Sequence, residues 1–340
     1  MKKYKFRMKK LIFPLGILAA LVMLASVSFF WWSQNSKPAS LDTTFQDFLV
    51  VRGRGASQIG EALYQEGLIK SPLAFKVYVQ VSSKAAKIQA GQFRISPNFP
   101  LVKVVDTLTK PPSELWVTIP EGLRREEIVE RFIKGIEVKE PDIPIFREQF
   151  LDESLGQEGY LFPDTYLFPR TATASTIVKR MRLTFELRAK ELAAAISSSS
   201  LSLDETIALA SIIERETKTD DERAVVAGIL LNRLEIGMGL QADATVQYAV
   251  ATANCRPGTE CNWWPVLRRD DLSINSPFNS YRFRGLPPSP IASPGLSSLK
   301  AAVSPEETDY LYYLHDAEGG IHYAETLAEH NENVRKYLGK

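Results

Sequence analysis

The most strongly apolar segments of the chain lie in its second half. Ser202 and Glu205 have the Ser-x-x-Glu spacing of a helix-capping box, and the residues that follow them are apolar almost all round a helix. Thr219 and Glu222 have a similar capping-box spacing, and they precede a second apolar run over residues 224–234. This pattern predicts two consecutive buried helices joined by a short turn.

A different apolar pattern occupies the N-terminus. The tail 1–10 carries six basic residues, and an uncharged run follows from Leu11 to Trp32. At 1.5 Å per residue this run is about 33 Å long, enough to cross a hydrocarbon core of about 30 Å. Residues 11–32 are therefore predicted to form a single transmembrane helix, with a cleaved signal peptide as the alternative. The basic tail would be cytoplasmic, so the rest of this inner-membrane protein would lie outside the cytoplasm.

Segments rich in polar residues and proline divide the remainder of the chain. Residues 33–44 are polar and predict a linker. A Lys-Pro-Pro-Ser break beginning at Lys110 separates a small module, residues 45–110, from a larger region, residues 111–340, whose core is expected at about 150–340. A strand-like run, a glycine turn and an amphipathic helix recur at the start of both parts. The pattern as a whole predicts an α+β protein.

Composition narrows the class of protein. The chain has 340 residues, of which 45% are hydrophobic, so it can bury more than one core and is not a disordered chain. Its 41 basic and 40 acidic side chains nearly balance. Nucleic-acid binding calls for a strongly basic face, so we expect no nucleic-acid partner.

One acidic residue stands out at the end of the first buried helix. Glu214 shares a helix face with Ile207 and Ala210, a face that should pack rather than be solvated. A carboxyl group in apolar surroundings resists ionisation and can serve as a general acid. The alternative is a surface ion pair between Glu214 and Lys218. Glu216 points to the opposite side of the helix and is a rival candidate rather than a partner.

Several blocks of the sequence resemble the endolytic murein transglycosylases, the YceG-like lytic transglycosylases of bacterial peptidoglycan. The similarity extends from about Phe48 to the C-terminus, and blocks in the same order are more specific than any single motif. The matching blocks are Glu158–Tyr166, Leu209–Thr217, Glu222–Arg223, Asn232–Leu234, Gly237–Met238, Leu240–Asp243, Thr245–Tyr248, Ser276–Tyr281, Gly285–Pro288 and Ile291–Gly295.

The resemblance implies an activity and a domain order. In this family the catalytic residue is taken as the first glutamate of a Glu-x-Glu pair, which corresponds to Glu214. That residue would cleave the β-1,4 bond after N-acetylmuramic acid without water and leave a 1,6-anhydro end, and no cofactor is implied. The family also carries a LysM-like βααβ module, which corresponds to residues 45–110 and binds glycan in other proteins. Nascent peptidoglycan strands are the expected substrate, and peptidoglycan synthases are the expected protein partners.

The matching blocks also supply candidate substrate contacts. Gln241, Asn279, Tyr281 and Tyr160 carry neutral hydrogen-bonding groups that suit sugar hydroxyl and acetamido groups, although each could simply anchor a loop. Asp243, in the same blocks, is the acidic member of this set of candidate substrate contacts.

Two other functions remain open at this stage. A conventional muramidase would need a second carboxylate at about 5 Å, or at about 6.5–9.5 Å, from the acid, and Asp243 is the candidate for it. A non-catalytic scaffold would bind peptidoglycan through the small module and leave it intact.

Cysteine and histidine positions argue against a metal site. Cys255 and Cys261 are close in sequence, and in an oxidising compartment they suit a local disulfide. His315, His322 and His330 lie far along the chain from them, so no metal-ligand cluster is predicted. His322 follows a Gly-Gly hairpin turn and is only a candidate neighbour of the site.

Overall fold

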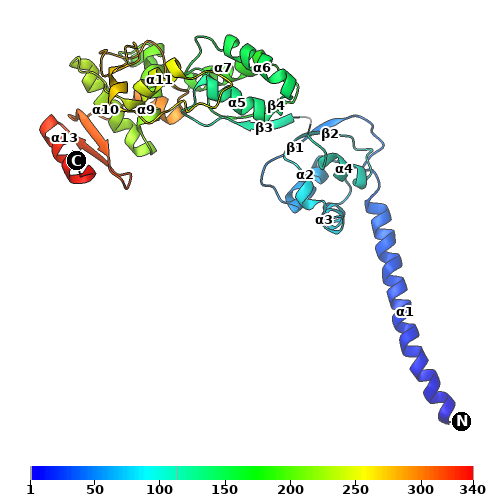
Figure 1. The fold of residues 1–340 in the computed structure, drawn as a ribbon. Helices are drawn as coiled ribbons and strands as arrows, with labels where there is room; N and C mark the ends of the chain where they lie inside the picture. The colour runs from blue at the N-terminus through cyan, green and yellow to red at the C-terminus, as the bar shows by residue number, and fades with distance from the viewer. Residues whose placement is uncertain (1, 113, 340) are drawn as a thin grey trace. The chain divides into compact units, whose positions relative to one another are not determined.

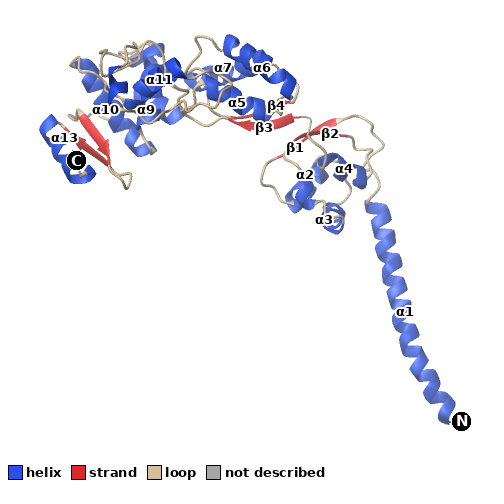
Figure 2. Ribbon diagram, viewed as in Figure 1, coloured by secondary structure: helices blue, strands red, loops and turns tan. Residues whose placement is uncertain are grey.

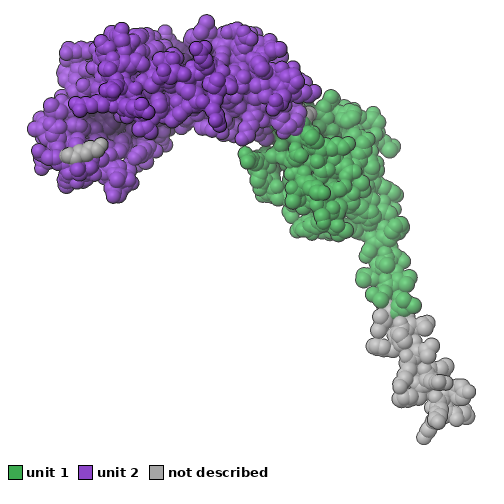
Figure 3. Space-filling view, in the orientation of Figure 1, with its two compact units in different colours: residues 1–115 green, residues 116–340 purple. Residues whose placement is uncertain are grey.

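The computed structural model describes residues 2–112 and 114–339 and is mixed α+β. The chain forms two compact units, residues 1–115 and residues 116–340 (Figures 1 and 3). Figure 2 shows that helices predominate in each unit, with short strands between them.

The first helix of unit 1, α1, runs from Lys2 to Asn35. The transmembrane prediction for residues 11–32 is wrong, because no helix within the described ranges is both long and apolar enough to cross a membrane. The predicted inner-membrane location depended on this helix and is therefore wrong as well. Helix α1 also continues past the predicted span into polar residues, from Ser33 to Asn35. Trp32, expected at a membrane interface, instead stacks on Tyr78 with ring centroids 5.6 Å apart.

The rest of unit 1 is a strand-helix-helix-strand arrangement followed by a helix. Its elements are β1 (Gln46–Val50), α2 (Ala56–Gln65), α3 (Pro72–Val81), β2 (Gly91–Ile95) and α4 (Leu101–Leu108). The two strands pair antiparallel, with Phe48 opposite Phe93. Alternate residues of β1 point inward, so Phe48 and Val50 join Leu63 and Phe75 in a buried core. The order of elements is the predicted one, while glycan binding by this module stays a prediction.

The first half of unit 2 packs helices around a cluster of aromatic rings. Strand β3 (Glu114–Thr118) runs into this unit, and its elements then are α5 (Arg125–Gly135), α6 (Ile143–Glu153), β4 (Thr165–Pro169), α7 (Ala174–Lys190) and α8 (Ala193–Ser198). Strand β4 lies next to β3, and the hydroxyls of Thr118 and Thr165 are 3.0 Å apart. Phe132 is fully buried and contacts the rings of Phe150 and Phe168.

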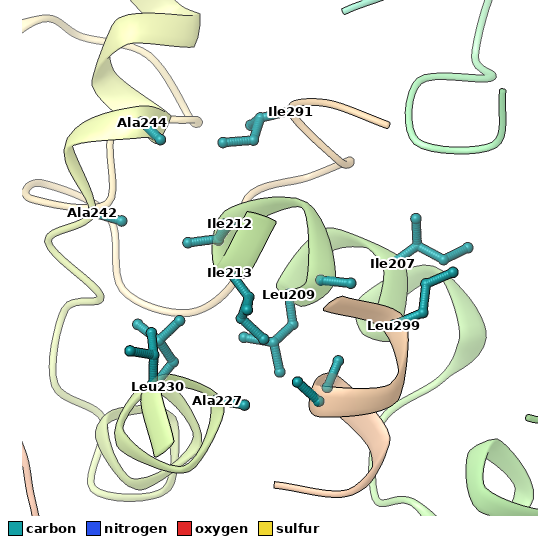
Figure 4. Packing of buried hydrophobic residues seen from close by; sticks show 14 of the residues in the cluster. Ile207, Leu209, Ile212, Ile213, Ala227, Leu230, Ala242, Ala244, Ile291 and Leu299 are labelled. Atoms are coloured by element: carbon teal, nitrogen blue, oxygen red, sulfur yellow. The ribbon is translucent and has the colours of Figure 1, made fainter. Parts of the chain in front are cut away.

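The second half of unit 2 is built around one buried helix. Its elements are α9 (Leu203–Glu216), α10 (Asp220–Glu235), α11 (Asp243–Asn254), α12 (Leu296–Val303), β5 (Tyr312–His315), β6 (Ile321–Ala324) and α13 (Leu327–Leu338). Figure 4 shows Ile213 and Leu209 of α9 on the side of Leu230 of α10, and Ile207 of α9 beside Leu299 of α12. The predicted pair of buried helices is therefore confirmed.

The helix starts follow the sequence signals only in part. The capping box of α9 is confirmed, because Ser202 and Glu205 exchange backbone and side-chain hydrogen bonds. The same signal fails for α10. Thr219 makes no side-chain cap, and the Glu222 carboxylate instead accepts from the Lys218 backbone N–H at 2.8 Å. That carboxylate also lies 3.3 Å from His315 Nε2 of β5, a tertiary partner that the local pattern could not reveal.

Candidate active site

The last turn of α9 sends two glutamates into different surroundings. Glu214 and Glu216 are two residues apart, so they leave the helix about 200° apart around its axis. Helix α10 and helix α12 both pack against α9, and the β5–β6 hairpin supplies a hydrogen-bond partner to Glu216, the final residue of α9. Each glutamate therefore meets a distinct set of neighbours.

Glu214 is enclosed by donors from α10 and α12. One carboxylate oxygen accepts from Arg223 Nη2 at 3.2 Å. The other accepts from the Gly295 N–H at 2.9 Å and from the Ser298 hydroxyl at 2.7 Å. Arg223 itself donates to Ser298 at 3.0 Å, and the Glu214 side chain is only 7% exposed. This arrangement joins three helices through one carboxylate.

Glu216 lies in the wall of a cavity of about 480 Å³. One carboxylate oxygen accepts from the Tyr313 hydroxyl at 2.9 Å, and the other accepts from the Ala244 N–H at 3.4 Å. Burial raises the pKa of Glu216, and nearby Asp243 raises it further, while the bonds from Tyr313 and Ala244 act in the opposite direction. A carboxyl that resists ionisation beside an open space has the properties of a general acid.

The cavity brings together residues from six parts of unit 2. They come from the ends of α9 and α10, the segment leading into α11, the loop after it, the β5 strand and α13. The lining residues are Glu216, Arg233, Gln241, Asp243, Tyr281, Tyr312, Tyr313, Leu314, His315, Leu327, His330 and Asn331. Three predicted contacts, Gln241, Asp243 and Tyr281, are thus assembled around Glu216, whereas Glu214 is not among the lining residues.

Two other predicted contacts lie away from this cavity. Asn279 is fully buried, and its amide donates to the carbonyls of Leu272 and Ile274 at 2.9 Å, so it fastens its own loop. Tyr160 lies near the opposite end of α9, where its hydroxyl donates to Asp204. Both match the loop-anchoring alternative that the sequence left open.

Gln241 has an unusual backbone conformation, with φ at +49°. Such a left-handed geometry is strained for a residue other than glycine, and it persists only where the surroundings enforce it. Here the Gln241 N–H donates to the Ser280 carbonyl at 3.2 Å, and Arg233 Nη1 donates to the Leu240 carbonyl at 2.5 Å. The exposed side chain of Gln241 is thereby held at the cavity wall.

Asp243 and Tyr281 form a hydrogen-bonded pair on the same wall. The Tyr281 hydroxyl donates to Asp243 at 2.7 Å. Burial, followed by the negative charge of Asp243, raises the pKa of Tyr281 well above its ordinary value. Tyr281 therefore stays protonated at neutral pH and presents a fixed hydroxyl beside Glu216.

The part of the cavity wall that β5 and α13 form was not predicted from the sequence. His315 and His330 line it, but they had been considered only as metal ligands and set aside. His322 is not a lining residue; its Nε2 lies 2.7 Å from Asp316, and its ring stacks on Tyr337. A hairpin followed by a capped helix could be predicted locally, but no local signal placed it against the end of α9.

The two cysteines are bonded to each other and are not among the residues that line the cavity. Cys255 and Cys261 form a disulfide with their Cα atoms 5.7 Å apart. Among the residues that the structure describes, no cluster of three or more His, Cys, Asp or Glu side chains could hold a metal ion.

Comparison with known proteins places this geometry in a family. Residues 48–336 match the model of the YceG-like family. A protein of Bacillus subtilis named endolytic murein transglycosylase is 30% identical over 338 positions, covering 92% of this chain and 90% of the relative. A protein of the same name from Streptococcus pneumoniae is 24% identical, and the match covers 96% of this chain but 65% of the relative.

A solved structure extends the agreement to the fold. The crystal structure of a yceG-like protein from Listeria monocytogenes matches 85% of this chain and 99% of its own with a TM-score of 0.54 and 27% identity. Since the family model matches most of its length, and a relative 30% identical matches 92% of it, the chain belongs to the YceG-like family.

Proposed function

We propose that this chain is a peptidoglycan lytic transglycosylase that cleaves within glycan strands, with Glu216 as its acid and base. The observation that carries the proposal is the carboxyl of Glu216, whose pKa is raised by burial and which lines a cavity rich in hydrogen-bonding side chains. The activity and the endolytic mode follow the names of the relatives. Glu214, the residue favoured by the sequence, already has three donors around its carboxylate and is better suited to holding helices together.

The reaction needs one carboxyl that acts twice. Protonated Glu216 first donates its proton to the oxygen that bridges C1 of N-acetylmuramic acid and the next sugar, and the C1–O bond breaks as positive charge develops on the ring. The carboxylate then takes the proton from the C6 hydroxyl of the same muramyl residue. The freed oxygen bonds to C1 and closes a 1,6-anhydro ring, so no water is consumed and Glu216 is protonated again.

The surroundings of Glu216 support both halves of this cycle. The Tyr313 hydroxyl and the Ala244 N–H can donate to the carboxylate that forms when the bridging oxygen is protonated. Burial favours the neutral acid that must be present at the start. Gln241 and Tyr281 lie in the same wall and supply amide and hydroxyl groups for the acetamido and hydroxyl groups of the sugars.

The position of Asp243 makes a hydrolytic mechanism the alternative to this proposal. Asp243 lines the same cavity as Glu216, as the second carboxylate of a muramidase would. Its carboxylate accepts from Tyr281, an arrangement that also suits a purely orienting role. The two mechanisms differ in the source of the oxygen that attacks C1.

The enzymatic function is tested by incubating the full chain with purified sacculi. Release of soluble glycan fragments is expected, followed by solubilisation of the wall. A protein that sediments with sacculi and leaves them intact would instead be the binding scaffold that the sequence allowed.

The pH dependence tests the role of Glu216. An acid works only while protonated, so cleavage should fall as the pH rises through the pKa of Glu216. The Tyr313 hydroxyl stabilises the charged form, so Tyr313→Phe should raise that pKa further and move the alkaline limb of the kcat/KM profile to higher pH. Tyr312→Phe, on the neighbouring residue, should leave the limb in place. A limb that stays fixed or moves to lower pH in Tyr313→Phe contradicts the assignment.

A further inference from the structure

A second cavity lies in unit 2 and shares no lining residue with the cavity around Glu216. Its volume is about 470 Å³, within the range of about 300–1,000 Å³ that small-ligand pockets occupy. It is lined by Trp116 of β3, by residues 164–167 around the start of β4, by residues of α7 and by Glu191 just after that helix. The proposed reaction uses none of these groups.

Strand alternation gives this cavity an aromatic wall. Val117 points into the buried aromatic cluster, so the neighbouring Trp116 lies on the opposite face of β3. Trp116 is half-buried and lines the cavity with Leu167, which alternation places on the same outer face of β4. Helix α7 adds Leu183 and Leu187, which are one turn apart and 47% and 55% exposed. Apolar surface therefore remains accessible on both the sheet side and the helix side.

The charges around this cavity balance one another. Arg188 lies 3.7 Å from Asp164 and 3.3 Å from Glu191. Arg180 is the other cation, so the described lining residues include two acidic and two basic side chains. The three paired side chains are 40% to 49% exposed, which leaves some of their donors and acceptors free to meet a ligand. Such a balanced set suits an uncharged ligand whose hydroxyl and amide groups both donate and accept hydrogen bonds.

An extended peptide is the competing occupant. Strand β4 is the last strand of its sheet in the described part of the chain, so one of its edges is open to an added strand. That edge is blunted at both ends, because the Thr165 N–H donates to the Asp164 carboxylate at 2.7 Å and Pro169 has no N–H. Three residues between them are too few for a stable ladder. An aromatic ring beside exposed hydrogen-bonding side chains instead favours a sugar, whose ring has an apolar face and polar edges.

We propose that this cavity binds N-acetylated sugar units of a peptidoglycan strand without cleaving them, with Trp116 stacked on the apolar face of one ring. The choice of peptidoglycan as the source of the sugar rests on the proposed function. Arg188 and Glu191 bond the hydroxyl and acetamido groups at the edge of the ring. Asp164 and Glu191 are exposed and paired with Arg188, so neither has the surroundings of a general acid. The cavity is thus a holding site, and a strand bound at two places stays on the enzyme longer.

Fluorine NMR of the full chain labelled with 5-fluorotryptophan tests this proposal. The sugar probe is N-acetylchitotetraose, an uncharged β-1,4-linked sugar without a muramyl residue, so it lacks the bond that the proposed reaction cleaves. The Trp116 resonance, identified as the one missing from Trp116→Phe, should shift on addition of the sugar and reach saturation. The resonances of Trp263 and Trp264, which line neither cavity, should keep their positions. An uncharged pentapeptide, the probe for strand addition, should leave the Trp116 resonance unchanged.

Two arginine variants of α7 test the polar contacts. Arg188→Ala should weaken the sugar affinity read from the Trp116 resonance about 10-fold, as expected for lost hydrogen bonds from a charged group. Arg182→Ala, on the same helix but outside the cavity, should leave that affinity unchanged. A Trp116 resonance that does not respond to the sugar, or that responds to the peptide instead, overturns the proposal. Cleavage plays no part in this measurement, so failure of the proposed function is a separate result, seen as intact sacculi.

Discussion

Glu216→Gln is expected to fold as the unaltered chain does and to lose nearly all of its glycan-cleaving activity. Glutamine keeps the size of the side chain and can still accept from Tyr313 and Ala244, but it has no proton to transfer. Loss of a general acid costs about 10²- to 10⁴-fold in rate. Release of soluble fragments from sacculi measures the activity, and circular dichroism measures the fold.

Glu214→Gln is the matched control two residues away. Removing its charge leaves Arg223 without one of its two acidic partners and weakens the junction of α9, α10 and α12. We expect a lower unfolding midpoint and activity that follows the folded fraction. A fully folded but inactive Glu214→Gln, together with an active Glu216→Gln, would return the catalytic role to Glu214.

Arg124→Ala is expected to destabilise unit 2 by about 3–5 kcal/mol, the cost of breaking a buried ion pair. The Arg124 side chain is 1% exposed and pairs with Glu126 at 3.2 Å. Its guanidinium also donates to Thr252 at 3.0 Å and lies over the rings of Tyr248 and Trp263. It therefore connects the start of α5 to α11 and to the loop after it, and no alanine can replace those contacts.

Urea unfolding followed by circular dichroism measures this effect. Arg182→Ala is the matched control, because Arg182 is 38% exposed and pairs with Glu186 on the surface of α7. A change of no more than about 1 kcal/mol is expected there. Equal shifts of the unfolding midpoint in the two variants would contradict the structural role assigned to Arg124.

The helices of the proposed site follow from the sequence more directly than the choice of its acid. The cap of α9 and the burial of the helix depend on residues within a few positions of each other, so the local pattern sufficed. The choice between Glu214 and Glu216 depends on partners far along the chain. Gly295 and Ser298 satisfy Glu214 from 81 and 84 positions away, and Tyr313 reaches Glu216 from 97 positions away.

Helix periodicity treats every apolar face as equivalent, so it could not choose between Glu214 and Glu216 by their surroundings. It identified the face of Glu214 as buried, and the side chain is indeed buried, but against Arg223 rather than in apolar surroundings. Only the packing of α12 on one side and of the β5 strand on the other distinguishes a structural carboxylate from one beside a cavity. The transmembrane prediction failed on a different ground: it rested on the length of an uncharged run, and no helix in the described part of the chain is long and apolar enough to cross a membrane.

Cleavage of purified sacculi in ¹⁸O-water, followed by mass spectrometry of the fragments, tests the central claim most directly. If Glu216 acts alone, the oxygen that attacks C1 is the sugar's own O6, so the new ends are anhydro and carry no label. Each such product is about 18 Da lighter than its hydrolytic counterpart, by the loss of one water. New reducing ends that carry ¹⁸O would contradict this mechanism and show that a second group, with Asp243 the candidate, brings water to C1.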